Sequence, residues 1–421
     1  MPKDKYVEIA IYNTFIFLYQ TAIRIAALFN EKARLWVNGR KDIFTKLSNA
    51  LSGNTHPILW VHCASLGEFE QGRPLIERFK REFPDYKILL TFFSPSGYEI
   101  RKNYNQADWV FYLPADTKSN ARTFVQLVQP KLAVFVKYEY WYHYLNELHN
   151  TYTPAILISA IFRENAIFFK WYGALHRKML QLFSHLFVQT YDSVERVKQF
   201  VSSEKITLAG DTRFDRVYEI AGSFEPIPAI ADFIKDRKVI VAGSTWPEDE
   251  IQLKKLMDQL EDEMLLIIAP HEITETHLQF VNNTFPGCVF YSQLKQNPQL
   301  NGSVLIIDNI GMLSKLYHYS TISYIGGGFN KSGIHNTLEA AVYGKPVVFG
   351  PNYQKFAEAV GLINCGGGFS YQNDNELIKV VQSLLGNEQK LQSVGTAADQ
   401  FVKNNTGATE KIITWVRRTF S

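Results

Sequence analysis

The chain has few cysteines and little excess charge of either sign. Each of these features excludes some classes of protein. Its 421 residues include three cysteines, Cys63, Cys288 and Cys365, which are far apart and odd in number. That spacing fits neither a disulfide framework nor a zinc pattern, so we expect a reducing cytosolic setting. A formal charge of +3, with no basic run beside stacking aromatic residues, argues against nucleic acid as a partner.

The common nucleotide fingerprints are also missing. After Gly326, Gly327 and Gly328 comes Phe-Asn-Lys-Ser-Gly, which is neither the glycine spacing of a dinucleotide-binding loop nor the Gly-Lys-Ser/Thr of a P-loop. No spacing of histidine, cysteine and carboxylate residues indicates a metal site. We therefore expect no metal and no cofactor, and a dinucleotide-dependent oxidoreductase is the least favoured class.

The amino terminus lacks a hydrophobic run of comfortable spanning length. The uncharged stretch from Ile9 to Ile23 is bounded by Glu8 and Arg24, whereas a spanning helix needs about 20 apolar residues. Its polar and apolar side chains separate onto different helical faces, and basic residues follow. Residues 1–40 are therefore predicted to be an amphipathic segment that associates with an anionic membrane surface. A helix packed on the rest of the protein is the alternative.

What the chain does contain is two series of alternating strands and helices. Alternation of buried strands with helices predicts parallel, doubly wound sheets of the α/β class. The predicted strands of the first series are 58–63, 87–93, 109–113, 132–136, 155–159 and 206–210. Those of the second series are 239–242, 265–269, 304–307, 322–325 and 347–349.

These two series predict two Rossmann-like domains, at 41–220 and 238–395. The linker is expected at 221–237, because this segment carries two prolines and no clear period. The last helical segment, 396–421, is long enough to cross back to the first domain. Two doubly wound halves that face each other across a cleft form the GT-B architecture, which many nucleotide-sugar glycosyltransferases share.

The stretch from Ser323 to Pro351 is the one around which the rest is organised. A strand leads into Gly326, Gly327 and Gly328, and the spacing of Asn336 and Glu339 predicts a capping box at the start of a helix. Bare backbone N–H groups and a helix N-terminus at the carboxyl edge of a parallel sheet can hold a phosphate group. A tight turn with a capped helix and no ligand is the alternative.

Two carboxylates follow strands of the first series. Glu68 is expected on the loop between strand 58–63 and a helix that begins near Phe69, and Glu139 follows strand 132–136. A carboxylate in a dry site at this edge can accept a proton from a substrate hydroxyl. The alternatives are that Glu68 only complements the helix dipole and that Glu139 pairs with Lys137 or Arg163.

Other polar residues are predicted to lie at the same edges. Ser244, His271, Gly311 and the Gly327 loop should share the carboxyl edge of the second sheet. Arg213, after strand 206–210, is a candidate for binding an anionic group, with an interdomain salt bridge as the alternative. His271 has the alternative of being an ordinary surface histidine.

These residues together resemble the 3-deoxy-D-manno-octulosonic acid (Kdo) transferases of lipopolysaccharide assembly, over nearly the whole chain. The motifs that carry the resemblance are Trp60–Glu68, Thr91–Gly97, Tyr112–Asp116, Glu139–Trp141, Gly326–Gly328, Gly333–Asn336, Leu338–Glu339 and Gly344–Pro351. Two departures are Lys137, where the family often has an acid, and Ala269–Ile273, which lacks an expected arginine beside His271.

The resemblance implies an inverting glycosyltransferase that moves Kdo from CMP-Kdo to a lipid A precursor, lipid IVA. It implies Glu68 as general base, Glu139 as a second catalytic carboxylate, an acceptor-binding first domain and a nucleotide-sugar-binding second domain. The donor-binding residues that it implies are Gly67, Arg213, Ser244, Thr245, His271, Gly311, Gly327, Gly328, His335, Asn336 and Glu339.

By the same resemblance, the protein should work at the cytoplasmic face of the bacterial inner membrane. Two other functions remain open. One is a GT-B epimerase or hydrolase of a nucleotide sugar, and the other is a non-catalytic protein that binds a glycolipid or nucleotide.

Overall fold

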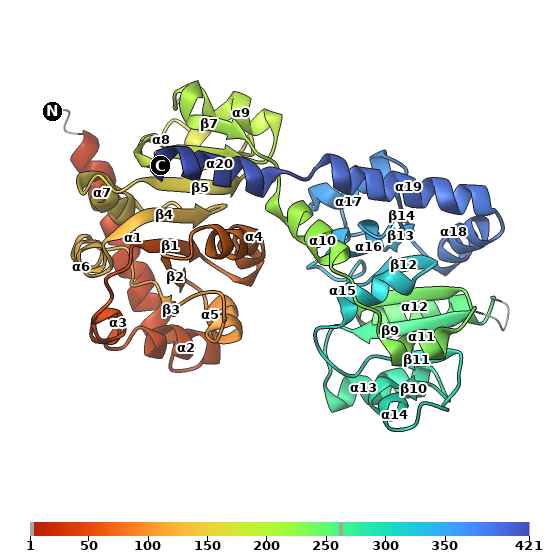
Figure 1. Ribbon diagram of the computed structural model, residues 1–421. Coiled ribbons are helices and arrows are strands. Elements are labelled where there is room, and N and C mark those ends of the chain that lie inside the picture. The colour runs from red at the N-terminus through yellow and green to blue at the C-terminus, as the bar shows by residue number, and fades with distance from the viewer. Residues whose placement is uncertain (1–3, 261–263, 421) are drawn as a thin grey trace. The chain divides into compact units, whose positions relative to one another are not determined.

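A computed structural model describes residues 4–260 and 264–420. The chain divides into two compact units, which we call unit 1 (Met1–Asp215 with Gly407–Ser421) and unit 2 (Arg216–Thr406). Figure 1 shows that each unit has strands at its centre and helices around them.

Unit 1 is built on a parallel sheet with the strand order β3-β2-β1-β4-β5-β6-β7. Its strands are buried along most of their length because helices cover both faces. The predicted strands are all found, and β6 is an additional one. The bounds are β1 Ile58–Cys63, β2 Lys87–Phe92, β3 Trp109–Tyr112, β4 Pro130–Val136, β5 Ala155–Ala160, β6 His185–Val188 and β7 Ile206–Leu208.

The helices of unit 1 form two apolar cores, one on each face of the sheet. Phe124, Leu145 and Met179 belong to one core, and Phe69, Ile76 and Ile412 belong to the other. The helices are α1 Asp4–Ala26, α2 Glu31–Gly39, α3 Ile43–Leu51, α4 Leu66–Glu82, α5 Pro95–Arg101, α6 Lys118–Val128, α7 Tyr142–Asn150, α8 Ala174–Leu182, α9 Tyr191–Val197 and α20 Ala408–Phe420, with 3₁₀ turns at Ile167–Phe169 and Ser203–Lys205.

Helix α1 packs on unit 1 with one face and leaves the other exposed. Ile16 is buried, Tyr12 donates its hydroxyl to Asp116 Oδ2 at 2.5 Å, and Asn13 Oδ1 lies 2.6 Å from His143 Nε2. The inner face therefore confirms the alternative of a helix packed on the rest of the protein, whereas association with a membrane stays a prediction. The exposed apolar side chains of α1 are Val7, Ile11, Phe15, Phe17, Leu18 and Ile25. By length and composition alone, Val7–Ala26 is long enough to cross a membrane.

Unit 2 has a second parallel sheet with the order β10-β11-β9-β8-β12-β13-β14. The predicted strands are again present, and the two at the sheet edges, β10 and β14, are additional. β10 has only two residues, and β14 (Gly-Phe-Ser) has a single apolar side chain, so neither forms an apolar run in the sequence. The bounds are β8 Val239–Thr245, β9 Leu265–Pro270, β10 Val289–Phe290, β11 Val304–Ile306, β12 Ile322–Ile325, β13 Val347–Phe349 and β14 Gly368–Ser370.

Unit 2 begins before the segment predicted as a linker. The boundary falls within α10 (Thr212–Gly222), and 221–237 contains α11 (Pro228–Ile234), whose Ile230, Phe233 and Ile234 are buried. Pro228 opens this helix rather than breaking a linker, because proline is favoured in the first turn. The chain rejoins unit 1 only at Gly407, after α19.

The other helices of unit 2 include several short ones. Between β11 and β12 lie α15 (Leu313–Leu316) and a 3₁₀ turn, Tyr317–Tyr319. The others are α12 Pro247–Met257, α13 Glu275–Thr284, α14 Tyr291–Gln296, α16 Leu338–Ala341, α17 Ala357–Asn364, α18 Asp374–Leu385 and α19 Glu388–Asn404.

Candidate active site

Glu68 lies in the first turn of α4, not on the loop where it was predicted. The helix begins at Leu66 and Ser65 is its N-cap, so Glu68 occupies the third helical position of a capping box. The Ser65 backbone N–H and hydroxyl both donate to Glu68 Oε2 at 2.8 Å. No hydrogen bond from residues 4–260 or 264–420 reaches Oε1. One oxygen therefore holds the carboxylate in place while the other remains available.

The surroundings of Glu68 raise the pKa of its carboxyl group. Burial is the main cause, and the negative charge of Glu139 adds to it. The hydrogen bonds from Ser65 and the nearby His62 act in the opposite direction, but they do not cancel the rise. A carboxylate with a raised pKa is a better proton acceptor near neutral pH.

Glu139 is fixed just after β4 by a partly buried tryptophan and a fully buried histidine. Trp141 Nε1 donates to Glu139 Oε2 at 2.7 Å, and His62 Nε2 lies 2.9 Å from the same oxygen. His62 is fully buried in β1, and its Nδ1 lies 2.9 Å from Thr91 Oγ1. Sequence reasoning gave His62 no role, although it is an imidazole in an otherwise largely apolar strand.

Gly67 leaves open space beside Glu68. A Cβ atom placed on Gly67 would meet no atom within 4 Å, so the packing of unit 1 does not require glycine there. Glycine at an exposed position in a helix also costs about 0.5–1 kcal/mol relative to alanine. The close approach of a ligand would explain why a side chain is absent.

Arg213 pairs with Asp211 in unit 1. Its Nε and Nη2 atoms donate to Asp211 Oδ2 at 3.0 and 2.7 Å, and Asp211 also accepts the Arg213 backbone N–H. The guanidinium is thus held by a neighbour within the same unit, and it lies partly exposed after β7.

The glycine loop of unit 2 does not present the row of bare N–H groups that the sequence predicts. The N–H of Gly326 donates to Gly243 O at 2.9 Å, and that of Gly327 donates to Asp249 Oδ2 at 2.8 Å. A Cβ on Gly328 would lie 2.5 Å from the Gly350 Cα. These glycines are needed chiefly because three stretches of backbone pack closely together.

The predicted helix after this loop is present but short. The prediction of a capping box formed by Asn336 and Glu339 is wrong. α16 covers Leu338–Ala341 with Thr337 as N-cap. Asn336 Oδ1 accepts the Leu338 N–H at 3.1 Å, and Asn336 Nδ2 donates to Glu339 Oε1 at 3.0 Å. Glu339 therefore accepts a hydrogen bond from a side-chain amide, and Asn336 is not the N-cap because the helix starts after Thr337.

Three rings gather at the carboxyl edge of the unit 2 sheet. His271 stacks against both Trp246 and His335, with ring centroids 4.7 and 4.4 Å away, and Trp246 Nε1 donates to His335 Nε2 at 3.3 Å. Burial and the neighbouring His271 lower the pKa of His335 to about 4, and burial also lowers the pKa of His271. The two imidazoles are therefore neutral at pH 7, and their rings can stack with another flat group. Sequence reasoning missed Trp246, which directly follows β8.

The remaining predicted donor residues lie in different environments. Ser244 has a φ of 54° at the end of β8, and Gly311 has a φ of 97° in the loop after β11. Thr245 is fully buried and donates its hydroxyl to Glu250 Oε1 at 2.8 Å. That side chain is closed to a ligand because its hydroxyl already holds the start of α12.

Comparison with known proteins gives the family. The family model described as 3-deoxy-D-manno-octulosonic-acid transferase (kdotransferase) matches residues 38–216. The 3-deoxy-D-manno-octulosonic acid transferase of Aquifex aeolicus is 30% identical over 344 residues, covering 80% of this chain and 89% of that protein. The enzyme of the same name from Rickettsia prowazekii is 28% identical over 409 residues, covering 93% and 87%.

Solved structures confirm the fold. The UDP-GlcNAc 2-epimerase of Neisseria meningitidis, bound to UDP-GlcNAc, has a TM-score of 0.60 at 16% identity and covers 86% of this chain and 100% of that chain. MurG of Acinetobacter baumannii has a TM-score of 0.54 at 13% identity and covers 86% and 99%. Both likenesses concern the two-domain α/β architecture, which is GT-B. The chain is thus a glycosyltransferase of GT-B fold that belongs to the 3-deoxy-D-manno-octulosonic acid (Kdo) transferase family.

Proposed function

We propose that the protein transfers Kdo from CMP-Kdo to a lipid A precursor, lipid IVA, with inversion at the anomeric carbon. The observation that carries the proposal is the Glu68 carboxylate, which has a raised pKa and one oxygen without a hydrogen bond from residues 4–260 or 264–420. A transferase that activates a sugar hydroxyl needs such a base, and membership of the Kdo transferases supplies the sugar.

In this mechanism Glu68 accepts the proton of a glucosamine hydroxyl. The freed oxygen forms a bond to the anomeric carbon of Kdo, and the bond from that carbon to the phosphate oxygen of CMP breaks, with the electron pair leaving on CMP. Glu139 acts beside Glu68, where its negative charge raises the pKa of the base. Gly67 leaves the space in which the acceptor hydroxyl approaches.

Donor binding is assigned to unit 2. The stacked rings of His271 and His335 offer a flat surface for the cytosine base, and Glu339 can accept hydrogen bonds from ribose hydroxyls. Ser244, Gly311, Gly327, Gly328 and Asn336 are the further proposed contacts in unit 2, and Arg213 is kept as a proposed donor-binding residue by the family resemblance alone. Because two glycine N–H groups are already used, side chains must supply more of the phosphate binding than the sequence alone indicates.

We assign the protein to the cytoplasmic face of the bacterial inner membrane. Helix α1 presents exposed Ile11, Phe15 and Leu18, while Tyr12 and Asn13 hold its other face on unit 1. A helix that is apolar on its outer face and hydrogen-bonded to a domain on its inner face is suited to lying in the membrane interface.

The direct test is to incubate the purified protein with CMP-Kdo and lipid IVA and weigh the lipid product by mass spectrometry. We expect the acceptor to gain the mass of one or more Kdo residues and CMP to be released. Conversion of a nucleotide sugar in the absence of acceptor would favour the epimerase or hydrolase instead. Binding of both ligands with no turnover would leave the protein as a non-catalytic binder, and either result would overturn the proposal.

A further inference from the structure

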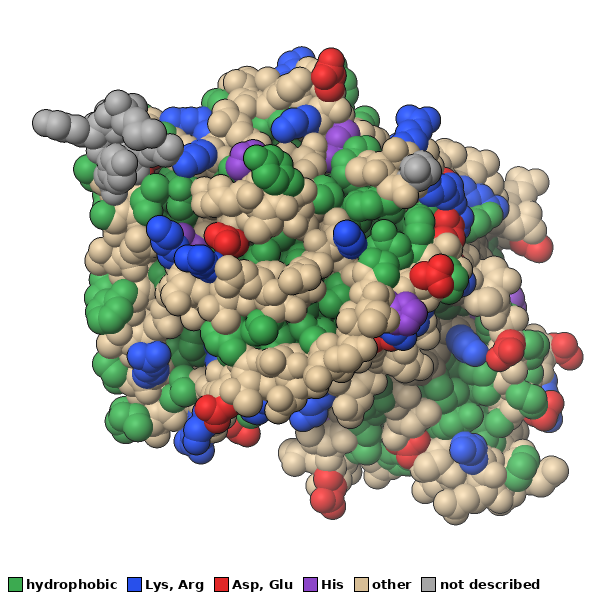
Figure 2. All heavy atoms as spheres, turned by 60° about the vertical axis from the view of Figure 1, so that its left-hand side comes forward, with side chains coloured by type: hydrophobic (Ala, Val, Ile, Leu, Met, Phe, Trp, Pro, Cys, Tyr) green, Lys and Arg blue, Asp and Glu red, His purple; other side chains and the backbone are tan. Residues whose placement is uncertain are grey.

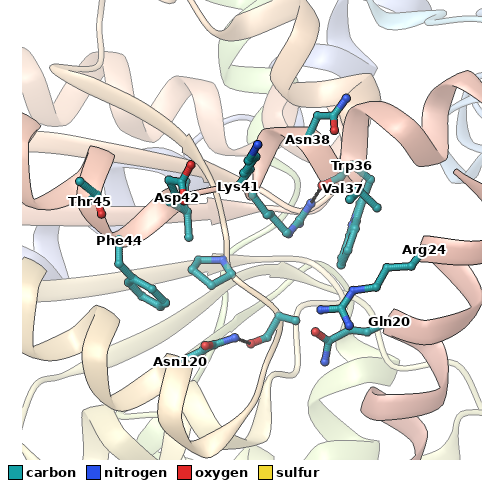
Figure 3. Close-up of a pocket in the computed structure, with 14 residues that line it drawn as sticks. Gln20, Arg24, Trp36, Val37, Asn38, Lys41, Asp42, Phe44, Thr45 and Asn120 are labelled. Carbon is teal, nitrogen blue, oxygen red and sulfur yellow. Dashed lines mark hydrogen bonds between the residues drawn. The ribbon is translucent and has the colours of Figure 1, made fainter.

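Unit 1 contains a cavity of about 480 Å³ that the proposed reaction does not use. It lies between α1, the end of α2, the start of α3 and the loop after β3. Figure 3 shows Gln20 and Arg24 reaching into it from α1, with Trp36 beside them and Asn120 below. Segments distant in the sequence therefore build one hollow that is lined by both polar and apolar groups.

The lining carries more positive than negative charge. Arg24, Arg40 and Lys41 line the cavity, and Asp42 is the one carboxylate among the lining residues. No residue in the described ranges forms a hydrogen bond or ion pair with the side chain of Arg24 or Lys41. Positive charges that no protein carboxylate neutralises are suited to an anionic ligand.

Two residues of the cavity wall, Arg40 and Trp36, pack on each other, and one of them carries a buried donor without a partner in the described chain. Arg40 stacks on Trp36 at 3.8 Å and donates to the Leu113, Phe93 and Trp36 carbonyl oxygens at 2.8, 2.7 and 3.1 Å. Trp36 is 7% exposed, yet its Nε1–H has no hydrogen-bond partner in the part of the chain that the structure describes. A buried donor without a partner is costly, and an oxygen atom of a ligand would satisfy it.

The cationic side chain lies in a row with exposed apolar ones. Phe17, Gln20, Arg24 and Leu28 follow one another at helical spacing along α1 and the turn after it. Phe17 is 66% exposed and Leu28 is 70% exposed. Figure 2 brings forward the side of the molecule that carries α1, where hydrophobic and basic side chains lie next to one another. A cation next to exposed apolar side chains can bind both the anionic headgroup and the apolar chains of a lipid. A free anion would use only the cation.

The cavity and Glu68 share one edge of the unit 1 sheet. The residues just after β3 line the cavity, Arg40 binds the carbonyl just after β2, and Glu68 follows β1. Neighbouring strands lie about 4.8 Å apart, so β3 and β1 are separated by about 10 Å. The rings of Trp36, Phe93 and Trp141 connect the two places, with centroids 5.8 and 4.8 Å apart. The distance of about 10 Å between β3 and β1 is comparable to the size of one sugar ring with its phosphate.

We infer that this cavity binds a phosphate group on the headgroup of a membrane lipid, and that it thereby places the sugar hydroxyl of the acceptor at Glu68. The second half of this inference rests on the proposed function, whereas the first does not. Arg24 and Lys41 supply charge, the Trp36 indole and the Gln20 amide supply hydrogen bonds, and the outer face of α1 supplies apolar contact.

The first experiment measures binding of the full chain to vesicles, without donor or transfer. Vesicles of phosphatidylcholine alone are compared with vesicles that also contain phosphatidic acid, which carries a phosphate monoester. The variant is Arg24→Ala with Lys41→Ala, and the matched control is Lys32→Ala with Lys46→Ala, which removes the same charge from exposed positions outside the cavity. We expect the first variant to lose about tenfold in affinity for the phosphatidic acid vesicles, with no comparable loss in the control.

Equal losses in both variants would overturn the inference, because they would show general attraction to a charged surface. Calorimetry with inorganic phosphate and no vesicles separates the two sources of phosphate. Binding of inorganic phosphate as tight as binding to the vesicles would overturn the assignment to a lipid, whereas much weaker binding supports it. Circular dichroism of both variants confirms that they are folded.

The second experiment follows transfer from CMP-Kdo to lipid acceptors with and without their phosphate groups. Removing the phosphate should raise KM for the wild type by about tenfold and leave the Arg24→Ala, Lys41→Ala variant almost unchanged, with kcat similar throughout. If removal of the phosphate raised KM equally in the wild type and the variant, the inference that the cavity places the acceptor would be overturned. Absence of transfer in every case would refute the proposed function and leave the vesicle result to be judged by itself.

Discussion

At the scale of single residues, the two carboxylates of unit 1 lie in different environments, and the proposed function gives them different roles. Glu68 is half-buried and has an available oxygen, whereas Glu139 is 6% exposed and is bound by Trp141 and His62. Substitution of Glu68 and substitution of Glu139 should therefore change the kinetics of transfer in different ways.

Replacing Glu68 by glutamine should lower kcat for transfer by about 10²–10⁴, the range that a general base contributes. The fold should persist, because the amide oxygen can still accept the Ser65 N–H. Initial rates with CMP-Kdo and lipid acceptor measure the effect. Glu70→Gln is the control, since Glu70 lies on the same helix but pairs with Arg101 at the surface. Comparable losses in both variants would count against Glu68 as the base.

The pH dependence of transfer should report the interaction of the two carboxylates. Glu68 must be ionised to accept a proton, so the rate should fall as pH decreases through its raised pKa. Glu139→Gln removes a negative charge that contributes to the rise, and the acid limb of the profile should move to lower pH. The position of the limb, rather than the height of the profile, is the measurement. A limb that stays in place would mean that Glu139 does not act through the pKa of Glu68.

Two glycines should respond to alanine in opposite ways. Gly328→Ala should lower the free energy of unfolding of unit 2 by about 1–3 kcal/mol, because its Cβ would overlap the backbone of Gly350 at 2.5 Å. Gly67→Ala should leave stability unchanged or raise it by about 0.5–1 kcal/mol, because its Cβ meets nothing and α4 favours alanine. Denaturant titrations give both values. On the proposed function, Gly67→Ala should also slow transfer, since the methyl group enters the acceptor space.

At the scale of elements, α1 is attached to unit 1 by polar contacts as well as by packing. The carboxylate of Asp116 accepts the Tyr12 hydroxyl and the backbone N–H groups of His143 and Tyr144, the last two at 3.0 Å. Asp116 thus joins α1, the loop after β3 and the start of α7.

Tyr12→Phe should destabilise unit 1 by about 1–2 kcal/mol, because the buried Asp116 carboxylate loses one of its three donors. Chemical denaturation followed by circular dichroism measures the change. Tyr152→Phe is the matched control, since Tyr152 is 94% exposed and should change stability by less than about 0.5 kcal/mol. An equal effect in both variants would mean that the bond contributes nothing to the attachment of α1.

At the scale of the whole molecule, the exposed face of α1 should decide where the protein acts. Replacing Ile11, Phe15 and Leu18 by serine should abolish binding to anionic vesicles while transfer to a soluble, deacylated acceptor continues. Vesicle sedimentation and solution kinetics measure the two effects. Tyr152→Ser is the control for loss of an exposed apolar group elsewhere. Retained vesicle binding would show that another surface attaches the protein.

Point substitutions are preferable to deletion of residues 1–40. Ile16 and Trp36 are buried in unit 1, and Arg40 binds the Phe93 and Leu113 carbonyl oxygens. Removing the segment would therefore disturb the packing of unit 1 as well as any membrane attachment by α1, and the two effects could not be separated.

The sequence by itself determined the two parallel sheets and the family. It also determined that Glu68 and Glu139 follow strands of the unit 1 sheet. Buried parallel strands are continuous apolar runs, and polar residues that follow such strands must lie at one edge, so β1, β4, Glu68 and Glu139 follow from local pattern. Only the tertiary structure decided which polar groups are already used. The Gly327 N–H is bound by Asp249, and Glu139 is bound by His62, in each case a partner more than 70 residues away in the chain. The cavity beside Arg24 was hidden for the same reason, because side chains from separate helices and a distant loop enclose it and no local pattern records that distance.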